Sequence, residues 1–340
     1  MNTRQADGWT RRRFLRGLTV AGTVGLLGLP SRRVAAEPPP ETTTLKLMRL
    51  PSICEAPVQV AGDLLVGEGF SDVQYVQGAA SPDAYKALAA GDVHLALLFA
   101  GGVVTRIDMG APLVLLGGIH VGCFELFGST RVHSVRDLKG KTVAIPALGS
   151  HQHLFVASIA AYVGLDPRTN IHWAIHRGPD AMQLLAEDKI DGLMGFPPEL
   201  QELRAKQIGH VVVNSTLDHP WSQYFCCMVA ANRDFVRAHP VASKRALRAL
   251  LKATDRCALE PMRAAQLVVE RGYTPRYDYA LQTLQEIPYN RWREYDPEDT
   301  VRFYALRLQE AGMIQSTPQK IIAQGTDWRF LHELKRELKG

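Results

Sequence analysis

The chain has 340 residues, of which 46% are hydrophobic and 21% are charged, and its formal net charge is +5. Seven of the 39 Lys and Arg residues but only one of the 34 Asp and Glu residues lie within residues 1–36, which leaves 32 basic and 33 acidic side chains beyond them. Such a balanced chain has no basic excess of the kind that binds nucleic acid, so we expect no nucleic-acid partner. The roughly 300 residues beyond position 36 are enough for two lobes with separate cores.

Residues 1–36 have the pattern of an export signal. Arg11 and Arg12 precede Phe14 and Leu15, an apolar run broken by glycines covers residues 18–29, and the segment ends with small residues at Ala36. The run is shorter than the roughly 18 to 20 residues that cross a bilayer as a helix. Twin arginines followed by Phe-Leu resemble a twin-arginine (Tat) signal. We therefore expect export to the periplasm and a soluble mature chain that begins near residue 37.

A Pro-rich linker at residues 37–43 separates this segment from a first series of strand and helix signals. Strands are predicted at residues 44–50, 73–76, 93–99 and 113–116. Pro57 opens one helix between them, and Ser81 is the N-cap of another that has Pro82 at its first position and ends at Gly91. Continuous apolar runs are typical of strands that are buried on both faces of a sheet. The alternation predicts an α/β protein with parallel strands.

A second series of the same kind follows from residue 138. Strands are predicted around residues 141–146, at 171–175, 190–194, 211–213 and 224–230, and helices at 150–163 and 180–186. From Pro240 onward the pattern is mostly helical. The sequence therefore predicts two α/β units and a helical C-terminal part.

The five cysteines are an odd number for an exported protein, and their spacing does not fit a disulfide framework. No spacing of Cys and His residues predicts a metal site, and no cofactor is expected. Cys226 and Cys227 are adjacent in an apolar run. As strand residues they are expected to point to opposite faces and to pack in the core.

Five segments, in this order, carry a resemblance to a known family. They are APVQVA at residues 56–61, AAGDVHLA at 89–96, DLKGKTVAIP at 137–146, Gly149-Ser150, and DKIDGL at 188–193. With EAGMI at residues 310–314, the chain resembles the extracytoplasmic substrate-binding proteins of ABC importers for taurine, aliphatic sulfonates, nitrate and thiamine-precursor pyrimidines. The resemblance covers residues 44 to 335.

The resemblance implies a two-lobed periplasmic binding protein fold of type II, in which two crossover strands join the lobes and the ligand lies between them. The first lobe is expected at residues 44–127 together with 228–340, and the second at residues 128–227. The resemblance also implies a small-molecule ligand, an ABC permease in the inner membrane as the partner, and a monomeric protein. Hinge closure of the lobes is the expected signal to the permease.

The loops that follow the strands are the candidates for ligand binding, because ligands of open α/β sheets lie beyond the carboxyl ends of the strands. The candidate residues in these loops are Ser52, Cys54, Glu55, Phe99, Ala100, Gly101, Gly149, Ser150, His151, Arg177 and Phe196.

The charge of the ligand stays open at this point. Gly149-Ser150 opens a helix, whose free backbone N–H groups either bind an anion or are capped by the Ser150 hydroxyl itself. His151 either adds positive charge there or is solvated, and Arg177 is the one cation among the candidate loops. Glu55 would repel an anion if it pointed into the cleft, whereas an outward, solvated Glu is the commoner case.

Cys54 has two interpretations. It lies at the end of the first predicted strand near a helix start, where a thiol is activated as a nucleophile or simply lines a pocket. Its place is similar to that of the nucleophilic Cys in the sulfinate desulfinase of the dibenzothiophene pathway, but residues 79–85 lack the His that serves that enzyme as a base. We therefore expect a solute-binding protein without catalytic residues. A Cys-dependent hydrolase or desulfinase on the same fold is the alternative, and a ligand sensor that docks a membrane receptor is the third possibility.

Overall fold

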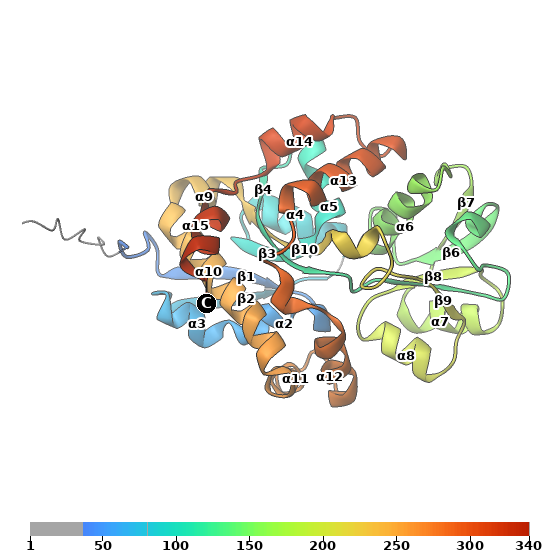
Figure 1. The fold of residues 1–340 in the computed structure, drawn as a ribbon, viewed down its shortest axis with the longest axis horizontal. Helices are drawn as coiled ribbons and strands as arrows, with labels where there is room; N and C mark the ends of the chain where they lie inside the picture. The colour runs from blue at the N-terminus through green and yellow to red at the C-terminus, as the bar shows by residue number, and fades with distance from the viewer. Residues whose placement is uncertain (1–36, 80, 340) are drawn as a thin grey trace, which may run out of the picture. The chain divides into compact units, whose positions relative to one another are not determined.

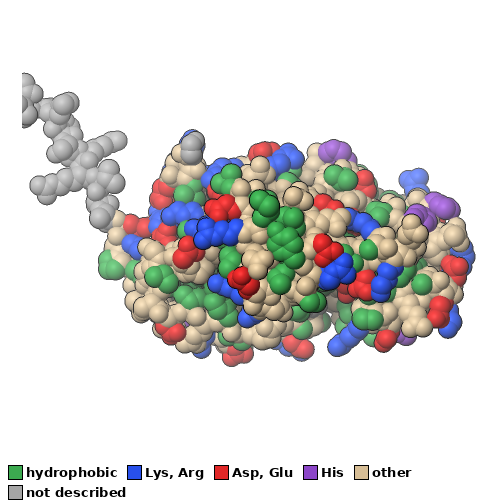
Figure 2. Space-filling model, turned by 90° about the horizontal axis from the view of Figure 1, so that it is seen from below, with side chains coloured by type: hydrophobic (Ala, Val, Ile, Leu, Met, Phe, Trp, Pro, Cys, Tyr) green, Lys and Arg blue, Asp and Glu red, His purple; other side chains and the backbone are tan. Residues whose placement is uncertain are grey.

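The computed structural model describes residues 37–79 and 81–339, and the predicted export signal lies outside them. The described residues fold into two sheets with helices on their faces, as Figure 1 shows. None of the helices within these ranges is both long and apolar enough to span a membrane. Acidic and basic side chains are interspersed over the face drawn in Figure 2, as the balanced charge predicts.

The first sheet has the strand order β2-β1-β3-β10-β4. Its strands are β1 (Thr44–Arg49), β2 (Asp72–Gln77), β3 (Leu95–Phe99), β4 (Leu113–Val121) and β10 (Phe225–Asn232). β1 is parallel to β2 and β3, but β10 is antiparallel to both β3 and β4. The sheet is therefore mixed: the prediction of parallel strands holds for β1, β2 and β3 but not for β10. The reason is that β10 enters this sheet on its return from the second one.

The second sheet has the order β7-β6-β8-β5-β9. Its strands are β5 (Glu125–Gly128), β6 (Lys141–Ile145), β7 (Ile171–Ile175), β8 (Gly192–Gly195) and β9 (His210–Asn214). β6 is parallel to β7 and β8, whereas β5 is antiparallel to β8 and β9. The two lobes thus repeat one plan, in which a crossing strand lies antiparallel within a βαβ sheet.

The chain changes sheet twice. It leaves the first sheet after Val121 and joins the second at Glu125, and it returns between Asn214 and Phe225. By sheet membership these crossovers lie at residues 122–124 and 215–224, a few residues before the boundaries predicted after residues 127 and 227. The α/β class, the two lobes and the two crossovers are confirmed.

Helices cover both sheets and build the C-terminal part. In the first series they are η1 (Ile53–Glu55), α2 (Ala56–Val60), α3 (Gly62–Gly67), α4 (Pro82–Ala90) and α5 (Ala100–Asp108). The second series holds η2 (Val135–Leu138), α6 (His151–Tyr162), α7 (Gly178–Ala186), α8 (Glu199–Ala205) and η3 (Trp221–Gln223). The C-terminal part holds α9 (Arg233–Ala238), α10 (Pro240–Leu259), α11 (Pro261–Glu270), α12 (Tyr277–Glu286), η4 (Tyr289–Arg291), α13 (Pro297–Glu310), α14 (Pro318–Gly325) and α15 (Arg329–Glu337).

Local chemistry fixes the ends of α4 as predicted. The Ser81 hydroxyl accepts a hydrogen bond from the Asp83 N–H, and Gly91 ends the helix in the left-handed conformation at φ 82°. A hydroxyl N-cap satisfies an N–H that the helix leaves free, and glycine adopts positive φ without steric cost. Sequence signals of this short range suffice to place such a helix.

Aromatic side chains of both lobes pack together where the sheets meet. Phe99 at the end of β3 packs edge-on against Phe124 of the first crossover, with ring centroids 5.4 Å apart. Phe124 in turn stacks on Phe155 of α6 at 4.9 Å. All three rings are buried. The lobes are therefore in contact through an apolar cluster that crosses from one to the other.

A charged contact joins the second lobe to the C-terminal part. Arg204 of α8 binds Glu125 of β5 through its Nε, 3.0 Å from Oε2, and binds Glu286 of α12 through Nη1 at 2.7 Å. Glu125 is buried and also accepts a hydrogen bond from the Asn214 side chain. The Arg204 guanidinium thus provides hydrogen bonds to the buried Glu125 carboxylate and also joins the second lobe to the C-terminal part through Glu286.

Candidate functional site

The carboxyl ends of strands from both sheets meet around a small cavity, which we call the inner pocket. Six of the eleven predicted residues line it: Ser52, Cys54, Glu55, Phe99, His151 and Phe196. The other lining residues are Leu50, Cys123, Phe124, Cys226 and Cys227. Its volume of about 20 Å³ leaves room for about one water-sized group.

A second, larger cavity of about 330 Å³, the outer pocket, shares Phe196 with the inner one. Two more predicted residues, Ser150 and Arg177, line it together with Ala79, Ser81, Asp83, Pro146, Ala147, Gln152, Gly178 and Glu199. The remaining predictions, Ala100, Gly101 and Gly149, line neither pocket. Gly101 instead allows close packing, because a Cβ there would lie 2.8 Å from the Phe99 ring.

Ser150 caps α6. Its hydroxyl accepts a hydrogen bond from the His153 N–H at 3.2 Å, while Nδ1 of His153 accepts the Gly149 N–H at 3.0 Å. Gly149 makes the preceding turn at φ 77°. The capping interpretation of Ser150 is thereby confirmed, and an anion at this helix end stays a prediction.

His151 is buried, so neither sequence interpretation of it holds. Burial lowers the pKa of its imidazole to about 4, so the ring is neutral at neutral pH and adds no positive charge. It packs edge-on against Tyr85 and near Phe99, with centroid distances of 5.5 and 6.0 Å. The residue contributes a neutral ring to the inner pocket.

Glu55 points inward, which corrects the expectation of a solvated side chain. It is 3% exposed, and its Oε2 accepts the Leu50 N–H at 3.3 Å. Burial raises the pKa of its carboxyl well above the usual range, and the nearby Cys227 raises it further. Burial therefore favours the neutral form of this carboxyl.

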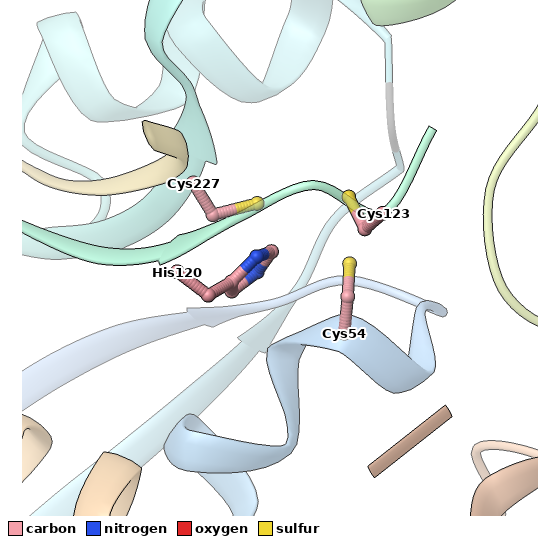
Figure 3. Close-up of side chains that lie close together, drawn as sticks. All are labelled: Cys54, His120, Cys123 and Cys227. Carbon is pink, nitrogen blue, oxygen red and sulfur yellow. The ribbon is translucent and has the colours of Figure 1, made fainter. Parts of the chain in front are cut away.

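Sulfur atoms gather beside this carboxyl. Cys54 from η1, His120 from β4, Cys123 from the first crossover and Cys227 from β10 bring their donor atoms within 4.8 Å of one another (Figure 3). Cys226 lies at the edge of this group, with its Sγ 3.0 Å from that of Cys123. The Ser52 hydroxyl is 3.0 Å from the Cys54 sulfur.

The prediction that Cys226 and Cys227 point to opposite faces was wrong. Their sulfurs are 4.0 Å apart, because the pairing of β10 with β4 shifts register on both sides of Cys227. A register shift of this kind locally breaks the alternation of a strand and turns neighbouring side chains to one side.

The thiols differ in acidity. Hydrogen bonds from Cys123, Cys226 and Cys54 lower the pKa of Cys227 well below that of an ordinary thiol. A hydrogen bond from Cys123 lowers the pKa of Cys54, but contact with Cys227 and burial raise it further, so that it ends well above the usual range. The pKa values of Cys54 and Cys227 are thus shifted in opposite directions.

Sequence reasoning missed His120, Cys123 and Cys227 as site residues. One signal was present: His120 and Cys123 are separated by two residues just past a predicted strand, a spacing at which two ligands can reach one ion. Cys123 also has a positive φ of 89°, which only the structure reveals.

Comparisons with known proteins agree on the fold. A search of curated proteins finds no match. The nitrate-binding protein NrtA from Synechocystis PCC 6803 is similar in structure with a TM-score of 0.72 at 15% identity, covering 89% of this chain and 90% of its own. The alkanesulfonate-binding protein SsuA from Xanthomonas axonopodis pv. citri, bound to MOPS, has a TM-score of 0.67 at 16% identity, covering 86% and 100%.

A third structure is the CA3427 gene product of Candida albicans, described as having the generic periplasmic binding protein fold. It has a TM-score of 0.65 at 14% identity and covers 84% of this chain and 96% of its own. At such identities the likeness shows the fold. The model of the family described as NMT1/THI5 like matches residues 68–264, more than half of the sequence. The chain belongs to the NMT1/THI5-like family.

Proposed function

We propose that the chain is an extracytoplasmic solute-binding protein that delivers a small organic solute to an ABC permease in the inner membrane. One observation carries this proposal: the outer pocket, which is large enough for a small organic solute, is lined from both lobes, by Ser81 and Asp83 on one side and by Ser150 and Arg177 on the other. A solute that touches both lobes binds the closed arrangement better than an open one. It therefore shifts the population toward closure, which is the signal a permease can read.

The outer pocket supports a solute with an apolar body and a polar end. Pro146, Ala147 and Phe196 offer apolar surface there, and the Ser150 and Gln152 side chains offer hydrogen bonds. The exposed Arg177 lies in the outer pocket, where a sulfonate or carboxylate group would meet its charge. The outer pocket suits a heterocyclic or aliphatic compound with one acidic group. The nitrate- and sulfonate-binding proteins of the same fold add support by analogy.

The test begins with the solute that the protein retains on purification. Native mass spectrometry of the folded protein is expected to show one bound organic molecule of low mass. When that molecule is added back to the stripped protein at a concentration a hundredfold above its dissociation constant, the free energy of unfolding of the protein is expected to rise by about 2.7 kcal/mol. The radius of gyration is expected to fall on binding. A constant radius with a tightly bound solute would contradict a hinged cleft.

The alternative of a Cys54-dependent hydrolase or desulfinase has less support, because contact with Cys227 and burial raise the pKa of the Cys54 thiol, which disfavours the nucleophilic thiolate. Long incubation with the solute is expected to return it unchanged. If the wild-type protein cleaves the solute and the Cys54→Ser variant does not, the protein is a Cys54-dependent enzyme and the proposal of a binding protein is wrong.

Export through the Tat pathway is the corresponding proposal for location. Changing both Arg11 and Arg12 to Lys is expected to leave precursor in the cytoplasm, as cell fractionation would show, because the paired arginines are the recognition element of that signal. Arg32→Lys and Arg33→Lys near the end of the segment are the matched control. Normal periplasmic accumulation of the first variant would contradict Tat export.

A further inference from the structure

We propose that Cys54, His120, Cys123 and Cys227 form a binding site for a soft divalent metal ion, with Zn²⁺ as the best match. The four donor atoms lie within 4.8 Å of one another and all four residues are buried. Figure 3 shows the three sulfurs and the imidazole converging from separate segments of the chain. The proposal goes beyond solute binding and does not depend on it.

His120 is arranged as a metal-binding imidazole. It is 1% exposed, and its Nδ1 lies 3.3 Å from the Val121 carbonyl oxygen, which can only accept a hydrogen bond. Nδ1 therefore carries the proton in the neutral ring, and Nε2 presents its lone pair. Among the described residues Nε2 has no hydrogen-bond partner although it is buried. A histidine that donates one ring N–H to a carbonyl while its other nitrogen faces a ligand set is the usual arrangement at metal centres.

Tyr289 positions two of the ligands. Its ring packs edge-on against the His120 ring at 5.3 Å, and its hydroxyl donates to the Cys54 carbonyl at 2.9 Å. Tyr289 is fully buried, so both contacts are held by packing. The imidazole and the Cys54 segment are thus oriented by one side chain that does not itself reach the ion.

The backbone also turns the sulfurs toward one point. Cys123 adopts φ 89°, a conformation that L residues rarely take, and the register shift in β10 directs Cys227 to the same side as its neighbour. Backbone outliers of this kind cluster at functional sites. Tetrahedral zinc with Zn–S bonds of about 2.3 Å requires sulfurs roughly 3.8 Å apart, so the present spacing needs only small side-chain movements to reach it.

The donor set selects the kind of ion. Three thiolates and one imidazole are soft ligands, which suit zinc and disfavour Mg²⁺ or Ca²⁺, ions that prefer oxygen. A divalent ion leaves a net charge of −1 on the site and a monovalent copper ion leaves −2, which costs more in a buried place. The cavity of about 20 Å³ beside the sulfurs has room for a single ion.

The experiment uses the purified protein, kept reduced with a phosphine, stripped with a chelator, and checked by mass for free thiols. One equivalent of Zn²⁺ is expected to bind in a competition titration with a chromophoric chelator. Co²⁺ in its place is expected to give the intense visible bands of a tetrahedral site and a near-ultraviolet sulfur-to-cobalt charge-transfer band whose strength corresponds to three thiolates. This spectrum tests the wild-type protein without any substitution.

Variants then identify the ligands. Cys123→Ser, Cys227→Ser and His120→Ala are each expected to weaken Zn²⁺ binding by at least about a hundredfold, since removal of even a supporting residue costs ten- to a hundredfold. The control is Cys257→Ser in α10, which removes a buried thiol outside the pocket and is expected to leave zinc affinity within about threefold. Circular dichroism confirms that each variant is folded.

Several outcomes would overturn the metal site. They are Zn²⁺ binding weaker than micromolar in the reduced protein, a cobalt spectrum without charge transfer, or equal affinity in the Cys123→Ser and Cys257→Ser variants. A Cys123–Cys226 disulfide that persists under reductant would also overturn it, because it would remove one ligand. None of these outcomes bears on solute binding, which the native mass spectrum and the radius of gyration test separately.

Discussion

The inner and outer pockets share Phe196 but place their remaining residues in different surroundings. Around the inner pocket even the ionisable groups Glu55 and His151 are buried, and burial shifts both toward their neutral forms. The outer pocket holds the exposed Arg177 and the partly buried Glu199. The residues that line the two pockets therefore have different roles. The inner set contributes shape, neutral hydrogen bonds and sulfur donors, and the outer set contributes charge.

The largest effect is expected for Phe99→Ala in the inner pocket. Phe99 is fully buried and packs edge-on against both Phe124 and Tyr304, so its removal leaves a cavity among rings from both lobes. The free energy of unfolding, measured with urea, is expected to fall by about 3–5 kcal/mol. Val66→Ala, at an exposed position, is the control and is expected to change it by less than about 0.5 kcal/mol. If Phe99→Ala lowers the free energy of unfolding by less than about 1 kcal/mol, the inner pocket is not more tightly packed than the outer one.

An intermediate effect is expected for Glu199→Gln in the outer pocket, where this side chain is partly buried. Burial raises the pKa of Glu199 to about 7 from its ordinary 4.5. The folded protein then holds this proton where the unfolded chain has lost it, so the contribution of Glu199 to stability is fully present below about pH 4.5 and is lost as the pH rises through about 7.

Unfolding of the Glu199→Gln variant at several pH values measures this effect. The amide does not ionise, so the variant is expected to be more stable than the wild type at pH 8 by about 1–2 kcal/mol, allowing for partial exposure, and equally stable at pH 4. Glu270→Gln, on the exposed surface of α11, is the matched control for the loss of one carboxyl. A constant difference between Glu199→Gln and wild type across this range would contradict a buried, titrating Glu199.

The smallest effect on stability is expected for Arg177→Ala in the outer pocket. Because this side chain is exposed, its removal is expected to change the free energy of unfolding by less than about 0.5 kcal/mol. The affinity for an acidic solute is expected to fall tenfold or more, measured by calorimetry with the solute retained on purification. Arg136→Ala, also exposed but outside both pockets, is the control. Unchanged affinity in Arg177→Ala would show that the acidic group lies elsewhere.

Much of the fold followed from local signals in the sequence. The cap at Ser81 and the stop at Gly91 act within one helix, so they are visible without tertiary information. β5 was missed because its four residues form a short segment that is recognisable only by its pairing with β8 and β9. The antiparallel direction of β10 likewise depends on its pairing with the distant strands β3 and β4, and no pattern within β10 itself indicates it.

The site was predicted where it depends on strand ends and missed where it depends on irregular backbone. Cys54 and Phe99 follow or end predicted strands and do line the inner pocket. β4 continues to Val121, but the apolar run breaks at Gly117 and Gly118, so the sequence did not place His120 at a strand end. The convergence of Cys227 with the other sulfurs requires a register shift that arises from long-range pairing.

The bridge that Arg204 makes to Glu286 has a consequence for the ionic environment of the protein. It joins α8 of the second lobe to α12 of the C-terminal part, and both side chains are partly exposed, so dissolved ions weaken their attraction. A rise in salt concentration is therefore expected to favour separation of the lobes, while the packed rings around Phe99 and Phe124 hardly respond to it. In the proposed hinge closure, this contact would make the balance between the open and closed forms depend on the ionic strength of the medium.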